Sequence, residues 1–266
     1  MRTTFLILWL LSFSVYAQTE TSMSGAMSRG MADALVGASH AYSFFDNPAG
    51  VGAQGTQLSS AYDTRFDLAE LSTVSASFTY AQKWGNLAIG GERFGGELYN
   101  VNKVGLGYAK KLNYVSLGVK TSILNSSFKD LSAHQTFITE LGVIANMWPQ
   151  LSIGLHAINV TGGTQKSGSP YPTTLRGGIY FTPAKALAIA AETSYILNEY
   201  ANVKVGLQYA LKEQLFFRTG VNTGLKTNHF GFGYLYQKWQ FDYAIDTHSA
   251  LGISHHLNLT MRFQQQ

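Results

Sequence analysis

The residues best suited to chemistry lie near the C-terminus, where His248, His255 and His256 are close in sequence to Asp246 and Ser249. A serine hydrolase needs a serine within hydrogen-bond reach of a histidine that a third group orients. His255 and His256 are adjacent, so on a strand they point to opposite sides and only one can face a given site. The pattern fits either a lipid-modifying enzyme or ordinary histidines at a membrane interface, and it favours the second.

No other spacing of residues indicates catalysis or cofactor binding. The sequence has no metal-ligand motif, phosphate-binding loop or G-x-S-x-G motif. It has no cysteine, which excludes disulfides, thiolate metal sites and a lipid-modified N-terminal cysteine. The net charge is only +4 and the basic residues are scattered, which argues against a nucleic-acid partner. The sequence therefore predicts a non-enzymatic protein that needs no metal or cofactor.

Twelve charged residues in the middle of expected strands form a second candidate set. All twelve fall in the phase of their strand that is not apolar, whereas random placement would put about half on each side. Six are positive and six negative, which predicts an ion-paired interior rather than a pore lining that selects one sign of charge. The predicted interior charges are Asp63, Glu92, Lys103, Lys120, Glu140, Arg176, Glu192, Lys204, Arg218, Asp242, Asp246 and Arg262.

Strands must position these side chains, and from Thr56 onward the sequence alternates between apolar and other residues with period two. One phase carries aliphatic and aromatic side chains, as in Val203, Val205, Leu207 and Tyr209. About fourteen strands are predicted, over residues 56–64, 72–82, 86–94, 98–110, 113–124, 134–146, 150–160, 172–182, 186–196, 201–210, 214–222, 228–237, 239–247 and 253–263.

The second phase of the strands is rich in glycine as well as in charge. A soluble β-sandwich also alternates, but its polar face is usually dense in Lys and Glu. Glycines on one face of a strand allow another segment to approach closely. The pattern therefore predicts a transmembrane antiparallel β-barrel whose interior receives a packed segment. The glycines concerned are Gly105, Gly107, Gly118, Gly142, Gly178, Gly206, Gly220, Gly231 and Gly233.

The composition supports this fold class, which is all-β. Charged residues make up 13% of the chain, about half of what is usual for a soluble domain, while aromatic residues also make up 13%. The many aromatic residues and the low net charge exclude a disordered chain. Beyond the N-terminus no apolar run approaches the roughly 18 residues that a membrane-spanning helix needs.

The connections between predicted strands are alternately short and longer. Those after even-numbered segments are tight, whereas residues 65–71, 125–133 and 161–171 form longer connections. Outer-membrane barrels have short turns on the periplasmic side and longer loops outside. Trp84, Trp148 and Trp239 all fall at the tight turns. We therefore expect these tryptophans to form an interface girdle on one rim of the barrel.

The N-terminal part of the chain divides into two segments before the barrel. Residues 1–17 have the features of a secretory signal peptide, and a signal anchor is less consistent with their short apolar stretch. Residues 18–54 lack period-two alternation, and we expect them to form a plug inside the barrel, the alternative being a loose periplasmic tail. Residues 55–266 form the predicted outer-membrane barrel. Its last strand ends on the aromatic residue Phe263, which is followed by three glutamines.

Residues 25–52, GAMSRGMADALVGASHAYSFFDNPAGVG, resemble the N-terminal region of the FadL-like outer-membrane barrel superfamily. The shared pattern is Ala-Arg-x-x-Gly-Met-Gly-x-Ala followed after a variable stretch by Asn-Pro-Ala. Matching positions here include Arg29, Gly30 and Met31, and then Asn47, Pro48, Ala49 and Gly50, whereas Ala32 stands where a second glycine is usual. The resemblance implies a fourteen-stranded barrel with its N-terminal segment folded inward.

The resemblance also implies a function in the bacterial outer membrane. FadL transporters have large extracellular loops that this chain lacks, so the compact PorV/PorQ-type proteins of the type IX secretion system are the nearer match in character. We therefore expect an accessory in protein secretion or surface attachment, with outer-membrane lipid and other secretion or outer-membrane proteins as partners. The alternative is a small FadL-like channel for passive uptake of hydrophobic compounds, which would bind a hydrophobic small molecule.

Overall fold

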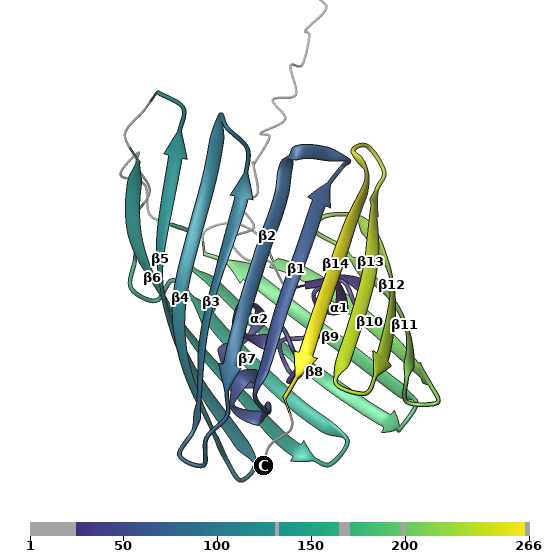
Figure 1. Cartoon of the computed structure of the whole chain (residues 1–266). Helices are drawn as coiled ribbons and strands as arrows, with labels where there is room; N and C mark the ends of the chain where they lie inside the picture. The colour runs from purple at the N-terminus through teal and green to yellow at the C-terminus, as the bar shows by residue number, and fades with distance from the viewer. Residues whose placement is uncertain (1–24, 131–132, 165–170, 198–200, 264–266) are drawn as a thin grey trace, which may run out of the picture.

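In the computed structural model, fourteen antiparallel strands close into one barrel, and the first strand pairs with the last (Figure 1). The structure describes residues 25–130, 133–164, 171–197 and 201–263. The predicted signal peptide and the first residues of the predicted plug lie outside these ranges. The strands are β1 Gln57–Arg65, β2 Leu68–Tyr80, β3 Asn86–Gly95, β4 Tyr99–Leu112, β5 Val115–Phe128, β6 His134–Trp148, β7 Leu151–Ile158, β8 Thr174–Ala184, β9 Leu187–Ile196, β10 Ala201–Leu211, β11 Leu215–Asn222, β12 Thr227–Tyr236, β13 Trp239–His248 and β14 Gly252–Arg262.

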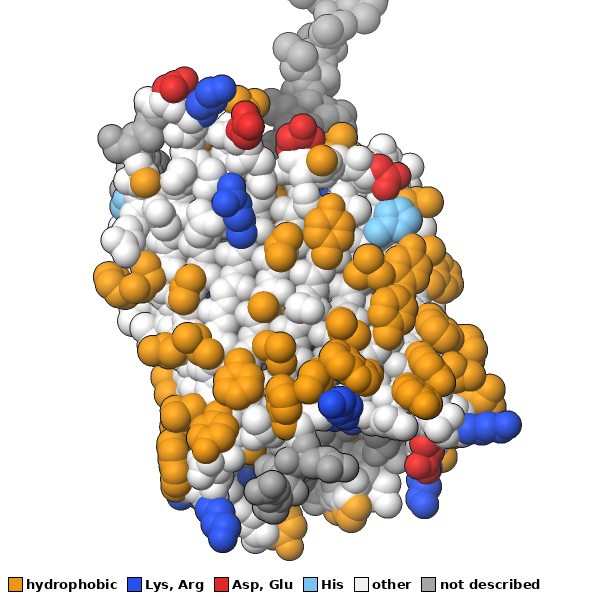
Figure 2. All heavy atoms as spheres, viewed as in Figure 1, with side chains coloured by type: hydrophobic (Ala, Val, Ile, Leu, Met, Phe, Trp, Pro, Cys, Tyr) orange, Lys and Arg blue, Asp and Glu red, His pale blue; other side chains and the backbone are white. Residues whose placement is uncertain are grey.

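The outer face of the barrel is apolar because it carries one phase of every strand. On β4, for example, the outward side chains Val104 and Leu106 are 59% and 64% exposed, while Lys103 and Ala109 of the other phase are buried. Figure 2 shows apolar side chains over much of this face, with charged residues near the two ends. Only a lipid environment makes so large an exposed apolar surface favourable. The predicted all-β membrane barrel with fourteen strands is confirmed.

Each of the fourteen predicted segments overlaps one strand, but two predicted loops are wrong. Residues 65–71 do not form a long connection, because β2 already begins at Leu68 and only Phe66 and Asp67 connect it to β1. These two residues both have left-handed backbone angles, with φ of 54° and 55°, as the centre of a type I′ hairpin requires. Likewise, β5 continues to Phe128 through residues predicted as loop.

The two ends of the barrel differ in their connections. At the end where β1 starts and β14 finishes, which we call the turn rim, the strands are joined by two to five residues. At the opposite end, the loop rim, the longest connection spans residues 159–173. Trp84, Trp148 and Trp239 all lie at the turn rim and are 51%, 65% and 41% exposed. By the usual orientation of such barrels, the turn rim faces the periplasm.

Residues 25–54, the N-terminal segment, lie inside the barrel (Figure 1). The segment contains the short helices α1 Gly25–Gly30 and α2 Ser43–Asp46 and the 3-10 helix η1 Pro48–Ala53. None of the described helices is long and apolar enough to cross a membrane. The segment buries two apolar groups against the wall, one around Phe44 and Phe45 and one around Met31 and Leu35. Each such large side chain contributes about 1.5–3 kcal/mol when fully buried.

Candidate functional site

Inward-facing glycines of the barrel wall allow the N-terminal segment to lie directly against it. A Cβ atom built at Gly206 of β10 would lie 2.6 Å from the carbonyl oxygen of Met31, and one at Gly231 of β12 would lie 2.9 Å from the Cα atom of Gly30. Both separations are too short for real contacts, so each wall position requires glycine. The same holds along the segment at Gly90, Gly118, Gly142, Gly154, Gly178 and Gly220. The segment therefore approaches the wall closely at most of the predicted glycines and also at Gly90 and Gly154, whereas Gly105 and Gly233 meet only residues of the wall itself.

Polar side chains of the wall satisfy the backbone carbonyl groups of the segment. Ser116 Oγ on β5 donates to Ala49 O at 2.6 Å, and Ser152 Oγ on β7 donates to Gly37 O at 2.7 Å. The amide of Asn86 on β3 donates to two further carbonyl groups, at 2.7 and 2.8 Å. Backbone carbonyls buried away from water need such partners. The wall therefore supplies hydrogen bonds that irregular backbone cannot make with itself.

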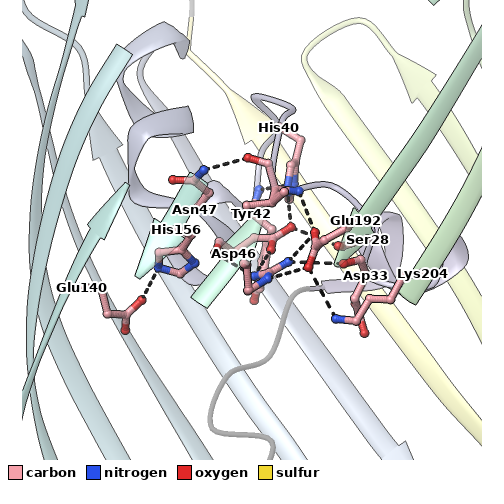
Figure 3. Close-up of polar contacts among 12 residues, drawn as sticks. Ser28, Asp33, His40, Tyr42, Asp46, Asn47, Glu140, His156, Glu192 and Lys204 are labelled. Atoms are coloured by element: carbon pink, nitrogen blue, oxygen red, sulfur yellow. Dashed lines mark hydrogen bonds and ion pairs between the residues drawn. The ribbon is translucent and has the colours of Figure 1, made fainter. Parts of the chain in front are cut away.

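Asp46 anchors the segment at the centre of the barrel (Figure 3). Its fully buried carboxylate accepts hydrogen bonds from Ser28 Oγ and His40 Nε2, both at 3.0 Å. The guanidinium of Arg176 on β8 lies 2.6 Å from the same carboxylate and 2.7 Å from Glu192 on β9. Glu192 in turn accepts from the backbone N–H of Val36 at 3.0 Å. Charges of the segment and of the wall thus compensate one another out of contact with water.

A second charged group lies on β3 to β7. Glu140 is fully buried and lies 2.8 Å from Lys120 Nζ and 3.0 Å from His156 Nε2. Lys103 Nζ bridges Glu140 and Glu92 at 3.4 and 3.7 Å. Lys120 also donates to the carbonyl oxygen of Phe44 at 2.9 Å, so this group contacts the segment as well.

The remaining predicted charges lie on β1, β10, β11, β13 and β14, and Lys204 of β10 lies 3.6 Å from Glu192. Arg218 pairs with Asp242 at 2.7 Å. His256 lies between two carboxylates, 2.6 Å from Asp63 and 3.3 Å from Asp246. The side chains of eleven of the twelve predicted residues are no more than 12% exposed.

Arg262 is the exception among the predicted interior charges. It is in the inward phase but is exposed, because it is the last residue of β14 and lies at the turn rim. There its guanidinium donates to Gln240 Oε1 at 2.6 Å. Its assignment to the interior is therefore wrong, since phase alone does not report the height of a residue in the barrel.

The Asn-Pro-Ala motif attaches the segment to the wall just before β1. Asn47 Oδ1 accepts from Ala49 N at 3.1 Å and so caps η1, while its Nδ2 donates to Val36 O at 2.7 Å and to Leu155 O of β7 at 3.3 Å. Pro48 begins η1 and Gly50 is buried beside Ser43. The earlier motif residues Arg29, Gly30 and Met31 are also buried, and Arg29 forms an ion pair with Asp33 at 2.6 Å.

An apolar cluster inside the barrel was not predicted. Leu124 on β5, Ile138 on β6 and Ile158 on β7 point inward and pack with Tyr171, whose carbonyl oxygen accepts from Asn159 Nδ2 at 2.7 Å. We call these four packed residues the interior apolar cluster, against which Val101 also packs. It lies on the loop-rim side of the charged group around Glu140. Its sequence signal is the adjacent apolar pair Ile123–Leu124, which breaks the alternation at that end of the strand.

A cavity of about 270 Å³ lies on the turn-rim side of the same strands. It lies between the segment, at Gly37 and Gly50, and the wall, at Ile144, Trp148 and Tyr180. From loop rim to turn rim, β5 to β7 therefore present an apolar level, a charged level and a cavity level. The residues at these levels are Leu124, Lys120 and Ser116 on β5, Ile138, Glu140 and Ile144 on β6, and Ile158, His156 and Ser152 on β7.

The C-terminal histidines are not arranged for serine hydrolysis. His256 faces inward, and both of its ring nitrogens lie against carboxylates. His255 faces outward, with Tyr243 Oη 2.7 Å from its Nδ1. The described residues contain no group of three His, Asp or Glu side chains placed to hold a metal ion.

The barrel resembles solved transporter structures. It is similar to the toluene transporter TbuX of Ralstonia pickettii, with a TM-score of 0.69 and 14% identity over 90% of this chain and 98% of that one. It is also similar to the Pseudomonas putida toluene transporter TodX, with a TM-score of 0.65 and 10% identity over 89% and 96% of the two chains. The chain has the fold of these toluene transporters. Its sequence matches no family model, and no curated protein is similar to it in sequence.

The barrel is also similar, to a smaller degree, to Omp33 of Acinetobacter baumannii. The TM-score is 0.51, with 13% identity over 78% of this chain and 96% of that one. These relatives and the apolar outer face confirm the predicted location in the bacterial outer membrane. Two of these three neighbours are toluene transporters and the third is an outer-membrane protein. None of them is a PorV/PorQ-type secretion accessory.

Acid is expected to loosen the N-terminal segment through Asp46. Burial alone would raise the pKa of this carboxyl, but Arg176 and His40 outweigh burial and hold the pKa well below its usual range. A depressed pKa stabilises the folded state above the unfolded value of about 3.9, and this contribution is lost as the pH falls below it. Limited proteolysis should therefore cut the segment faster at pH 3 than at pH 6. The Asp46→Asn variant should show a smaller change, and an equal change in both proteins would contradict this role.

Proposed function

We propose that the protein is a small FadL-like channel for passive diffusion of hydrophobic compounds across the outer membrane, without enzymatic activity. The observation that carries this proposal is the interior apolar cluster on the loop-rim side, a group of large apolar side chains on an inner wall whose other buried residues are mainly polar, glycine or alanine. Apolar side chains on the lumenal face of a barrel are expected where an apolar solute binds. The fold shared with two toluene transporters supports the same class of solute.

The proposed route follows β5 to β7. A solute that leaves the interior apolar cluster meets Lys120, Glu140 and His156 and then residues 44–50 of the segment before it reaches the cavity at the turn rim. We propose that residues 18–54 act as the plug of this route, after removal of residues 1–17, and that residues 55–266 form the channel. Displacement of the plug would join the two ends of the route.

Polar substitutions in the interior apolar cluster test this function. Cells that produce the Leu124→Gln, Ile138→Gln variant should accumulate toluene more slowly than cells that produce the original protein, because the cluster no longer favours an apolar solute. The conservative variant Leu124→Met, Ile138→Val keeps an apolar surface of similar size and should retain uptake. Surface levels of folded barrel, measured by heat modifiability on gels, serve as the control.

Two outcomes would reject the channel. One is toluene uptake that is equal with and without the protein in the membrane. The other is co-purification of a stable large translocon or surface protein from gently solubilised membranes, which would instead support the secretion accessory. Lipid hydrolysis that disappears in a His256→Ala variant would support the enzyme.

A further inference from the structure

The charges at the two rims of the barrel are distributed unequally. Among the described residues, the exposed charges at the turn rim are seven cations and only one acid, Glu213. At the loop rim the exposed acids Asp67, Glu70, Glu97 and Asp130 are balanced by basic residues nearby. On the face drawn in Figure 2, most acidic side chains lie near the loop rim, together with basic ones, whereas the charged side chains at the opposite end are mainly basic. The turn-rim cations are Lys83, Lys110, Lys111, Lys185, Lys212, Lys238 and Arg262.

The basic turn rim coincides with the edge of the lipid-facing surface. Trp84, Trp148 and Trp239 lie there with exposed rings, and Lys238 Nζ is 5.9 Å from the centre of the Trp239 ring. Trp84 stacks on Tyr108, whose hydroxyl donates to Trp84 O at 2.9 Å. Tryptophan and tyrosine rings of this kind occupy the level of the lipid headgroups. The lysines therefore lie where lipid phosphates are, and not in the open periplasm.

We propose that the turn rim is a binding surface for anionic phospholipid headgroups of the membrane leaflet that it faces. A lysine near an anionic membrane surface is attracted by it, and long lysine side chains reach the headgroup level while their carbon chains stay against the apolar belt. Lys111, which lines the interior cavity, and Arg262 belong to the inward phase of their strands. The other five cations, spaced around the closed rim, would hold a shell of such lipids. The interaction is independent of whether the barrel conducts solutes.

The tryptophans of the turn rim report directly on the lipids beside them. The fourth tryptophan, Trp9, lies in the leader that we expect to be removed. The purified barrel is reconstituted in phosphatidylcholine vesicles that contain brominated phosphatidylglycerol or, at the same mole fraction, brominated phosphatidylcholine. Bromine quenches only nearby tryptophans. One lysine can enrich an anionic lipid about fivefold at its side, so phosphatidylglycerol should quench more strongly.

Two matched variants separate the turn rim from the rest of the surface. The turn-rim variant Lys83→Gln, Lys110→Gln, Lys185→Gln removes three cations. Lys83 precedes Trp84 in sequence, and Lys110 lies on the same strand as Tyr108, which stacks on Trp84. The loop-rim variant Arg93→Gln, Lys129→Gln, Lys226→Gln removes the same number of charges from the other end. The excess quenching by phosphatidylglycerol should fall in the first variant and persist in the second.

Salt provides a test that needs no substitution. At 1 M salt the screening length falls to about 3 Å, so the excess quenching by phosphatidylglycerol should largely disappear in the original protein. Equal quenching by the two brominated lipids at low salt would overturn the proposal. So would an excess that falls equally in both variants, or binding of a soluble acidic polymer without any lipid preference.

Discussion

Replacing Gly118, Gly142 and Gly154 together by alanine is expected to displace the N-terminal segment and convert a closed barrel into an ion-conducting pore. A Cβ atom at Gly142 would lie 2.8 Å from Ala49 N, and one at Gly154 would lie 2.6 Å from the Cα atom of Gly37. These contacts are with backbone, which cannot turn aside as a side chain can. Overpacking of this kind costs about 1–3 kcal/mol at each site.

The measurement is single-channel conductance in planar bilayers. The triple variant should conduct at a level close to that of a barrel that lacks residues 19–45, while the original protein stays closed. A control variant, Gly91→Ala with Gly177→Ala, places two methyl groups on the outer face, where they meet no part of the segment. It should stay closed. A folded triple variant with unchanged conductance would show that the segment is not what closes the lumen.

Replacing Arg176 by methionine is expected to lower the free energy of unfolding by about 3–5 kcal/mol, as is typical when one partner of a buried ion pair is removed. The substitution leaves the carboxylates of Asp46 and Glu192 buried with less compensation, since Arg176 lies within 2.7 Å of both. Denaturant titration in detergent measures the loss. Lys204→Met should cost less, because Lys204 lies 3.6 Å from Glu192, which keeps Arg176.

A double-mutant cycle shows whether Asp46 and Arg176 act together. If the ion pair is what binds segment and wall, Arg176→Met combined with Asp46→Asn should cost less than the sum of the two single substitutions. Additive losses would mean that Arg176 acts through Glu192 alone. Comparison of conductance in the same variants then separates the stability of the barrel from docking of the segment.

The strands could be predicted from sequence because lipid and interior impose opposite demands on alternate residues. Near the loop rim the period-two pattern is lost, as in Leu68-Ala69-Glu70-Leu71 and Asn125-Ser126-Ser127, while the ladder of hydrogen bonds continues. This is why β2 begins at Leu68 and β5 reaches Phe128 in residues predicted as loops. Alternation reports contact with lipid more directly than it reports strand length.

The interior could be predicted only in part. Arg176 and Glu192 face the interior from adjacent strands, in the phase that alternation indicates, but their partner Asp46 lies in a segment without periodicity, 130 residues before Arg176. No local pattern encodes such a contact, because it depends on how the segment turns inside the closed barrel. The interior apolar cluster was missed for a different reason, since Leu124 and Ile138 occupy the phase that is polar elsewhere on their strands.

The charges that hold the N-terminal segment have one other available partner, which is water. If the segment left, water could hydrate Arg176, Glu192 and Lys120, so an empty barrel would remain a stable hydrophilic tube. The segment therefore behaves as a ligand tethered to its own receptor, with only the short stretch between η1 and β1 as the tether. So short a tether keeps the local concentration of the ligand high, and the balance between docked and released states depends on small differences in free energy.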